Sequence, residues 1–248
     1  MPTKPPPIKN AMILAAGLGT RLRPITDTMP KPLVRIAGKP MIDYVLDLLS
    51  AVGVETACVN VHHFADQMEA HLKQRSHPAI VFSDERSALM NSGGGLAKGL
   101  KLLEAGPVLV MNADLFWVGE YPAETSNLER LASFFDPDRM DMALLCVRNA
   151  DTTGHNGKLD FALGADGRLT RYQEGMVNPV VYAGAIAMHS RLLASAPDDA
   201  FNLNIYFDRA IVEKRLFGIL LEGHWLTVGT PDAIGEAEAA ITRFGVRK

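Results

Sequence analysis

The sequence predicts an α/β protein in which a mainly parallel sheet is flanked by helices on both faces. Short apolar runs alternate with amphipathic segments up to about residue 150. These runs lack the polar alternation of a strand with one wet face, which favours strands that are covered on both sides. Of the 248 residues, 48% are hydrophobic and 21% are charged, which is typical of one large folded domain.

The first half of the chain predicts a repeated order of strand and helix. Between Ile42 and Leu49, apolar residues recur at the spacing of one helix face. The short apolar runs on either side of such segments are the predicted strands. The predicted strands are 11–17, 55–61, 79–83 and 107–114, and the predicted helices are 41–53, 65–75 and 94–106.

The second half has a different residue pattern. Its segment 154–174 contains short stretches of alternating apolar and polar residues around the turn-forming pair Asp166 and Gly167. This pattern predicts a β-hairpin. Strands are expected at 180–189 and as a pair within 217–229, and helices at 204–216 and 231–245. We expect an extended tail at 1–10 and a single domain over 11–248, with halves at about 11–150 and 151–230 and a closing helix at 231–245.

Composition excludes several classes of protein. Lys and Arg number 25 against 28 Asp and Glu, so no cationic surface for nucleic acid is expected. No apolar run approaches the roughly 18 to 20 residues that cross a bilayer, and the proline-rich start does not resemble a secretory signal. The two cysteines, Cys58 and Cys146, lie in separate apolar runs, as is typical of core residues in a reduced cytoplasmic protein.

The segment 14–33, LAAGLGTRLRPITDTMPKPL, directly follows the first predicted strand. Gly17 and Gly19 allow a ligand to approach the backbone, at the strand end where open α/β sheets bind ligands. The segment lacks the third glycine of a dinucleotide fingerprint and the GK[ST] of a P-loop. Arg21 and Lys31, the latter between two prolines, add two cations. Together these features predict a site that neutralises a polyphosphate as it reacts.

The same segment resembles the signature G-x-G-T-R-(x)n-K-P of the sugar-1-phosphate nucleotidyltransferases. The similarity continues through NSGGG at 91–95, VMNAD at 110–114, GKLDF at 157–161 and GHWLTVGTPDAI at 223–234. The resemblance implies a Rossmann-like sheet, the nucleotide-diphospho-sugar transferase fold, with a nucleotide-binding half and an inserted antiparallel sugar-binding lobe. It also implies a reaction in which a sugar phosphate oxygen attacks the α-phosphorus of a nucleoside triphosphate and pyrophosphate is released.

The resemblance also implies roles for individual residues. Arg21, Lys31 and Asp114 would be catalytic, with Asp114 binding Mg²⁺, a hard cation that prefers oxygen ligands. The implied nucleotide-binding residues are Leu14, Ala15, Ala16, Gly17, Gly19, Thr20, Asn91, Gly93 and Gly94. The three glycines of NSGGG would allow close packing against a flat base.

On the sugar side, the resemblance implies contacts from Asn112, Asn156, Gly157 and Glu174. Two positions depart from the family pattern. Gly175 stands where many members have a lysine that binds the sugar phosphate, so this contact would depend on Lys31, Lys158 or Arg171. Thr227 replaces the aspartate that usually forms the second carboxylate of the metal site, which implies weaker binding of Mg²⁺.

Two adjacent histidines, His62 and His63, follow the second predicted strand. Neighbouring residues on extended chain point to opposite faces, so the pair is not expected to bind one metal ion. Roles in packing or in the entry to the next helix fit better.

The order of the motifs is most similar to that of short bacterial members that act on N-acetylmuramate 1-phosphate. It implies UTP as the nucleotide, a role in cell-wall sugar recycling, and a monomer or small homo-oligomer. Mannose or heptose 1-phosphate guanylyltransferases and other nucleotide-sugar pyrophosphorylases remain alternatives. Thr227 also leaves open a protein of another class, a noncatalytic sensor of nucleotide sugars.

Overall fold

The computed structural model describes residues 8–120 and 125–245. The larger helices are α1 (Met41–Ala51), α2 (Ala65–Leu72), α3 (Asn91–Leu100), α4 (Asn127–Phe134), α5 (Asn204–Val212) and α6 (Asp232–Phe244). The strands are β1 (Asn10–Leu14), β2 (Arg35–Ile36), β3 (Lys39–Pro40), β4 (Thr56–Val61), β5 (Ala79–Asp84), β6 (Pro107–Asn112), β7 (Leu115–Val118), β8 (Met142–Val147), β9 (Thr152–Thr153), β10 (Phe161–Leu163), β11 (Leu169–Arg171), β12 (Pro179–His189), β13 (Leu216–Leu220) and β14 (His224–Thr227). Short 3-10 helices are η1 (Thr20–Leu22), η2 (Ile25–Asp27), η3 (Lys31–Leu33), η4 (Asn149–Asp151) and η5 (Ser190–Leu193).

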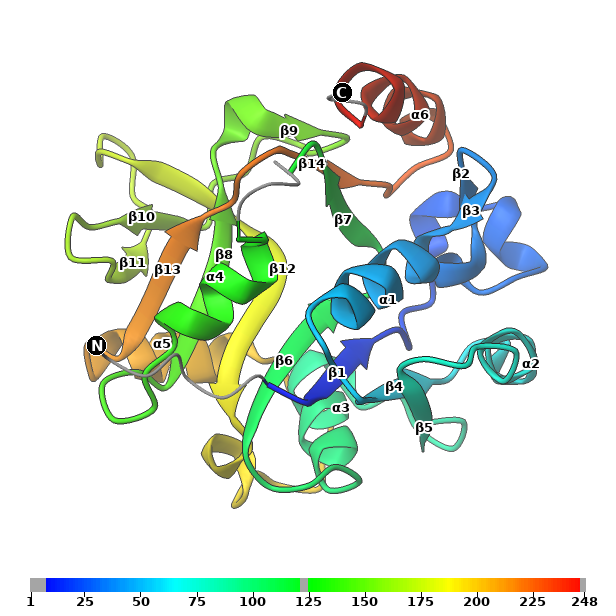
Figure 1. Ribbon diagram of the computed structural model, residues 1–248, viewed down its shortest axis with the longest axis horizontal. Coiled ribbons are helices and arrows are strands. Elements are labelled where there is room, and N and C mark those ends of the chain that lie inside the picture. Colours follow the sequence, from blue (N-terminus) through cyan, green and yellow to red (C-terminus); the bar gives the residue numbers. More distant parts are fainter. Residues whose placement is uncertain (1–7, 121–124, 246–248) are drawn as a thin grey trace.

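A mixed sheet runs through the centre of the molecule (Figure 1). Its main path has the order β11-β10-β12-β6-β1-β4-β5, and β8 and β13 join through β12. β1 is parallel to both β4 and β6, and β4 is parallel to β5, so the predicted parallel core is confirmed. The long strand β12 is antiparallel to β6, β8 and β10 and connects the two halves of the chain.

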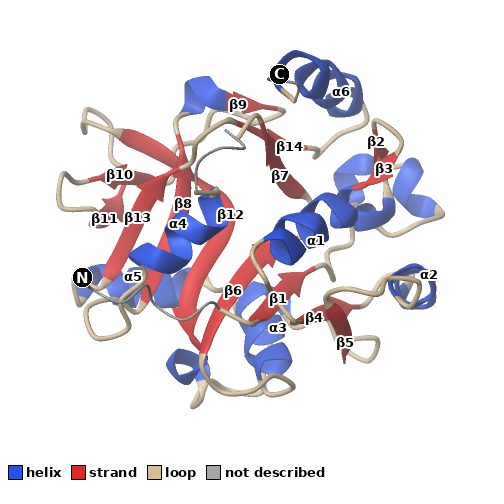
Figure 2. Ribbon diagram, in the orientation of Figure 1, coloured by secondary structure: helices blue, strands red, loops and turns tan. Residues whose placement is uncertain are grey.

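Helices cover both faces of this sheet, as the unbroken apolar strands predicted (Figure 2). One core contains residues of α1, α2 and α4, and the other contains residues of α3 and α5. Alternate residues of each strand divide between them: Ala11 and Ile13 of β1 belong to the first core, and Met12 belongs to the second. Successive side chains of a strand point to opposite faces, so one short strand supplies both layers.

A three-stranded sheet of order β7-β14-β9 lies beside the main sheet, and α6 packs on it (Figure 1). A third core of buried residues joins α6, β7, β14 and the first residues of α1. The chain enters this sheet directly from β6, because only Ala113 and Asp114 separate β6 from β7. This short connection places Asp114 between the two sheets.

The second half of the chain follows the predicted elements with one difference in strand pairing. The hairpin around Gly167 is confirmed, with Leu163 paired to Leu169, and it extends the edge of the main sheet through β12. The two strands predicted within 217–229 also form. They do not pair with each other, because β13 joins β8 in the main sheet and β14 joins β7 and β9.

The ends of the described chain refine the expected boundaries. Most of the tail expected at 1–10 lies outside the described residues, whereas Ile8 is buried and β1 begins at Asn10. The closing helix is observed as α6, with Pro231 at its N-cap position. Within the described residues, no helix is long and apolar enough to cross a membrane.

Candidate active site

The glycine loop leaves β1 at the carboxyl edge of the parallel strands. Leu14, the last residue of β1, is paired in register with Asn112, the last residue of β6. Two parallel strands that end together create the crevice in which open α/β sheets bind ligands. The loop after Leu14 and the Asp114 turn after Asn112 therefore lie next to each other.

The two glycines of this loop have different surroundings. Gly19 has a φ of 65°, and a Cβ atom there would lie 2.9 Å from the Cβ of Lys31 and 3.0 Å from Thr26. The Thr26 hydroxyl donates a hydrogen bond of 2.8 Å to the carbonyl of Gly19. In contrast, a Cβ on Gly17 would meet no atom within 4 Å. Gly19 is thus required by the packing of the loop, whereas Gly17 leaves space open for a ligand.

Lys31 and Asp114 contact each other although 83 residues separate them. Lys31 is the first residue of η3, after the extended residue Pro30 and before Pro32, which restrict the backbone on both sides. Its ammonium donates a hydrogen bond to the Asp114 carboxylate. The Lys31 side chain is 11% exposed and that of Asp114 is 32% exposed, so the lysine is mostly buried and the carboxylate is partly open to solvent.

Arg21 and Thr227 lie at the end of β14 that is close to Asp114. A Cβ on Gly229, just after β14, would lie 3.4 Å from the guanidinium carbon of Arg21, so the Arg21 head group lies close to this backbone. Thr227 is paired in register with Leu115, the residue that follows Asp114. The structure therefore brings the three predicted catalytic residues and the altered Thr227 position to one edge of the two sheets.

A buried polar relay lies beneath the loop. The amide of Ala15 donates a hydrogen bond of 2.6 Å to Oδ1 of Asn60, and Nδ2 of Asn60 donates one of 2.7 Å to the carboxylate of Glu85. The other Glu85 oxygen accepts a hydrogen bond of 2.9 Å from the amide of Met90. Asn60 is 3% exposed and Glu85 is fully buried. Neither residue was among those predicted from the sequence. The sequence did offer one signal for Asn60, which is a polar residue near the end of the otherwise apolar strand segment 57–61.

The glycines at the start of α3 pack against protein. The amides of Gly93 and Gly94 donate hydrogen bonds of 2.9 and 3.2 Å to the carbonyl of Phe201. A Cβ on Gly93 would lie 2.3 Å from the Phe201 ring, and one on Gly94 would lie 2.5 Å from the Asp199 carbonyl. The Cβ side of these glycines is therefore packed against the segment 199–201, and their contact with a base stays a prediction. Asn91 is exposed and its side chain caps the amide of Ser92.

A cavity of 230 Å³ opens next to Asn112. It is lined by Leu14, Ser92, Asn112, Asp160, Phe161, Arg171, Tyr182, Asn202, Leu203, Asn204 and Phe207. The guanidinium of Arg171 forms its wall, held by hydrogen bonds of 2.7 Å to Asp208 and 2.8 Å to Asn204. Of the predicted sugar-contacting residues, Asn112 lines this cavity.

The other predicted sugar-contacting residues lie elsewhere on the surface. Asn156, Gly157 and Glu174 are exposed and do not line the cavity beside Asn112. Asn156 accepts a hydrogen bond of 3.1 Å from the amide of Lys158 within its own loop. The loop begins at Gly154, where a Cβ would lie 2.0 Å from the carbonyl of Thr227, so it packs directly on the end of β14. The roles of Asn156, Gly157 and Glu174 in binding the sugar stay predictions.

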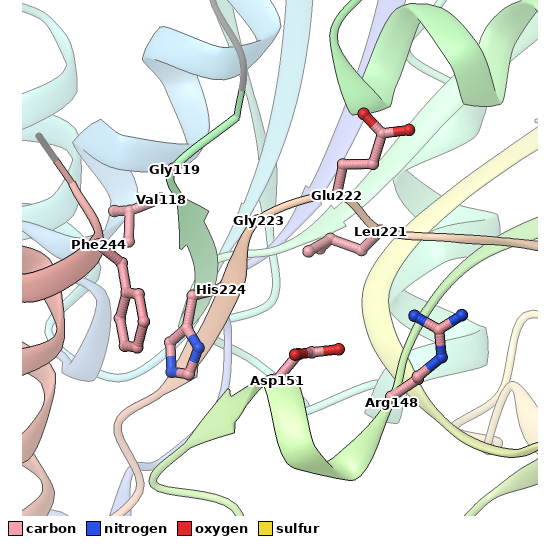
Figure 3. Close-up of a pocket in the computed structure, with 9 residues that line it drawn as sticks. All are labelled: Val118, Gly119, Arg148, Asp151, Leu221, Glu222, Gly223, His224 and Phe244. Carbon is pink, nitrogen blue, oxygen red and sulfur yellow. The ribbon is translucent and has the colours of Figure 1, made fainter. Parts of the chain in front are cut away.

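A second cavity, of 310 Å³, lies at the opposite end of the β7–β14 pair (Figure 3). His224 of β14 pairs with Val118 at this end, whereas Thr227 pairs with Leu115 at the end near Asp114. The imidazole of His224 stacks on Phe244, with ring centroids 4.0 Å apart, and burial lowers the pKa of His224. The length of the strand pair thus separates this cavity from the proposed catalytic residues.

The two adjacent histidines bond to different parts of the backbone. Nδ1 of His62 lies 2.7 Å from the Glu85 carbonyl, and Nε2 of His63 lies 3.2 Å from the Thr26 carbonyl. Both rings therefore connect loops that surround the glycine segment. Over residues 8–120 and 125–245, no three His, Cys, Asp or Glu side chains gather as a metal site.

The nucleotidyl transferase family matches residues 10–155 of the chain, which is more than half of its length. This chain belongs to the nucleotidyl transferase family. Over 237 residues, the nucleotidyltransferase is 42% identical to an N-acetylmuramate alpha-1-phosphate uridylyltransferase of Caulobacter vibrioides, covering 94% of this chain and 97% of the relative. A protein of the same name from Neisseria meningitidis is 32% identical, covering 92% of this chain and 96% of the relative.

Solved structures show the same fold at low sequence identity. A UDP-glucose pyrophosphorylase complexed with UDP-glucose superposes on the nucleotidyltransferase with a TM-score of 0.75 at 18% identity, covering 95% of this chain and 99% of the other. The inositol-1-phosphate CTP transferase from T. maritima has a TM-score of 0.75 at 16% identity, covering 98% and 99%. The predicted family and fold are thereby confirmed. The protein is therefore an enzyme, a member of the sugar-1-phosphate nucleotidyltransferases.

Proposed function

We propose that this nucleotidyltransferase converts UTP and N-acetylmuramate 1-phosphate into UDP-N-acetylmuramate and pyrophosphate. The contact between Lys31 and Asp114 is the observation that supports this type of reaction, because it places a cation and a carboxylate at the crevice where β1 and β6 end. The 42% identity over 94% of the chain supports the choice of substrates. A cytoplasmic role in the recycling of cell-wall sugars fits these substrates.

The reaction needs no nucleophile from the protein. An oxygen of the sugar phosphate, which carries most of its second negative charge at pH 7, attacks the α-phosphorus of UTP. The bond from the α-phosphorus to the bridging oxygen breaks, and its electron pair leaves with pyrophosphate. Catalysis of this step is mainly a matter of positioning and charge stabilisation. In the proposal, Lys31 binds the α-phosphate and the sugar phosphate, and Arg21 binds the β- and γ-phosphates.

The residues present fit a magnesium ion that arrives with the nucleotide. Mg²⁺ keeps several water ligands and is commonly held by one or two carboxylates together with substrate phosphates. Asp114 supplies one carboxylate at the crevice. Thr227 is paired in register with Leu115, the residue after Asp114, and its neutral hydroxyl is the second oxygen proposed for the ion. When bound, the ion would neutralise phosphate charge. Asp114 would hold it, while Lys31 exchanges its contact with Asp114 for the phosphate.

We assign the nucleotide and the sugar to different sides of the crevice. The nucleotide is proposed to lie along 14–20 and Asn91, with Gly93 and Gly94 supporting that segment through their packing on 199–201. The sugar is proposed to enter the cavity beside Asn112. A pocket of 230 Å³ is below the roughly 300–1,000 Å³ typical of drug-sized ligands and suits a single sugar ring.

The substrate choice is tested by measuring pyrophosphate release in the presence of Mg²⁺. Each of the four nucleoside triphosphates is combined with the 1-phosphates of N-acetylmuramate, N-acetylglucosamine, glucose and mannose, and with choline phosphate. Turnover restricted to UTP with N-acetylmuramate 1-phosphate is expected. A different productive pair would keep the reaction and replace the substrates.

The noncatalytic sensor that Thr227 left open is not supported, because the chain belongs to a family of enzymes. Nucleotide binding without turnover in any combination of the same panel would contradict the proposed function.

A further inference from the structure

We infer that Asn60 and Glu85 are positioning residues that hold the two walls of the nucleotide site at a fixed separation. One wall is the loop that begins at Ala15, and the other is the segment that enters α3 at Met90. The inference rests on the nucleotidyl transfer proposed above and not on which sugar is used. Neither side chain needs to touch the substrate for this role.

The directions of the hydrogen bonds follow from the chemistry of the groups. A carboxylate only accepts, and both Glu85 oxygens accept, one from Nδ2 of Asn60 and one from the amide of Met90. The Asn60 amide group is therefore oriented with its nitrogen toward Glu85. Its Oδ1 must then face the amide of Ala15, as observed at 2.6 Å. A single carboxylate thus sets the orientation of a chain of groups that ends at the glycine loop.

The surrounding structure is built to accommodate this relay. A Cβ on Gly95 would lie 2.6 Å from Oε1 of Glu85 and 2.8 Å from Nδ2 of Asn60, so the third glycine of NSGGG makes room for the pair. The backbone of Glu85 is also held on both sides. Its amide donates a hydrogen bond of 2.8 Å to Val61, and its carbonyl lies 2.7 Å from Nδ1 of His62.

Burial makes the relay sensitive to a change of one atom. Glu85 is fully buried and Asn60 is 3% exposed, so water does not readily replace a lost partner. In Glu85→Gln, one carboxylate oxygen becomes an NH₂ group and faces a donor. If Asn60 rotates to accept from it, the Asn60 nitrogen faces the amide of Ala15. The mismatch is then transferred to the loop that is proposed to bind phosphate.

The decisive experiment is a double-variant cycle of Glu85→Gln and Asn60→Asp. In Asn60→Asp, two carboxylates would face each other. In the double variant, Asp at 60 accepts from Ala15 and from the new amide at 85, whose oxygen accepts from Met90. Every donor regains an acceptor, with one buried charge as before.

The readouts are UTP affinity by calorimetry, kcat and KM for the nucleotide and the sugar phosphate, and the unfolding midpoint. All are compared at a temperature at which every variant is folded. We expect each single variant to lose about ten- to a hundred-fold in kcat/KM for the nucleotide, since one buried, charge-assisted hydrogen bond is lost. The KM for the sugar phosphate should change little, and the double variant should recover most of the loss.

Asn127→Asp is the matched control. Asn127 is also a buried asparagine, 1% exposed, and it bonds to the backbone of Glu222 at 2.8 and 2.9 Å, outside the proposed site. This control should lower the unfolding midpoint and leave the kinetic constants unchanged. The inference is overturned if Glu85→Gln and Asn60→Asp do the same. It is also overturned if the double variant regains stability without regaining UTP affinity. The substrate panel tests the choice of sugar independently of this cycle.

Discussion

At the scale of single residues, Lys31 and Asp114 balance each other's charge at the proposed site. Lys31 is mostly buried, and its ammonium hydrogen bonds to the Asp114 carboxylate. A substrate phosphate would compete with Asp114 for the same ammonium. The pair therefore keeps a lysine in place at the crevice before the nucleotide binds, which lowers the cost of orienting it later.

Replacing Lys31 by alanine tests its role in the transition state. We expect Lys31→Ala to lower kcat by about 10²–10³-fold, because its proposed contact strengthens as charge develops on the transferring phosphate. The affinity for UTP should fall much less. Steady-state kinetics and calorimetry on the same preparation would separate the two effects. Equal losses in kcat/KM and in UTP affinity would place Lys31 in ground-state binding instead.

Replacing Thr227 by aspartate tests whether this position faces the metal ion. Thr227 is aligned with Leu115, one residue beyond Asp114. We expect Thr227→Asp to lower the Mg²⁺ concentration that gives half-maximal activity, because a carboxylate is a stronger ligand for Mg²⁺ than a hydroxyl. The measurement is a Mg²⁺ titration of activity at saturating substrates. Thr227→Ser is the control, and an unchanged titration in the aspartate variant would contradict the placement.

At the scale of elements, the start of α3 shows that a glycine-rich segment in a binding motif also serves packing. The first turn of the helix bonds to the Phe201 carbonyl, and its glycines fit against Asp199 and Phe201. The segment 199–201 immediately precedes α5, so the contact joins the nucleotide-binding half to the second half of the chain. The helix start is consequently fixed by a part of the chain more than a hundred residues away.

Alanine at Gly94 and at Gly17 should separate packing from binding. A Cβ on Gly94 would lie 2.5 Å from a backbone oxygen, so we expect Gly94→Ala to lower the free energy of unfolding by about 1–3 kcal/mol. Gly17→Ala adds its methyl group to open space and should unfold like the wild type while its UTP affinity falls. Denaturant unfolding and calorimetry test both. Wild-type stability in Gly94→Ala would contradict the observed packing.

At the scale of the whole molecule, the two cysteines are probes of the packing of the core, because both are buried in it. Cys58 and Cys146 are buried on the same face of the main sheet, in the core shared with α3 and α5. Burial raises the pKa of Cys58 to about 12, and burial also raises the pKa of Cys146. Neither thiol is therefore suited to act as a nucleophile at neutral pH. This outcome agrees with their prediction as core residues.

The raised pKa values predict a loss of stability in alkaline solution. An unfolded thiol loses its proton near pH 8.5, whereas the folded Cys58 keeps it to about pH 12. Above pH 8.5 the unfolded state therefore binds fewer protons than the folded state. The free energy of unfolding should consequently decrease as the pH rises from 8.5 toward 12. Denaturant unfolding between pH 7 and 10, with Cys58→Ala as the control, measures the difference. The native protein should also resist thiol reagents at pH 8, and rapid labelling without unfolding would contradict the burial.

The sequence by itself determined the family, the order of the main strands and helices as far as β6, and the identity of the proposed catalytic residues. It did so because strand periodicity, the glycine loop and the charged residues around it are local features. Only the tertiary structure decided that Lys31 meets Asp114, that β13 and β14 join different sheets, and that residues 199–201 cover the glycines of α3. It also revealed the relay through Asn60 and Glu85. These contacts join residues far apart in the chain. Their geometry depends on how the sheets and the cores pack together, and a local sequence pattern does not contain that information.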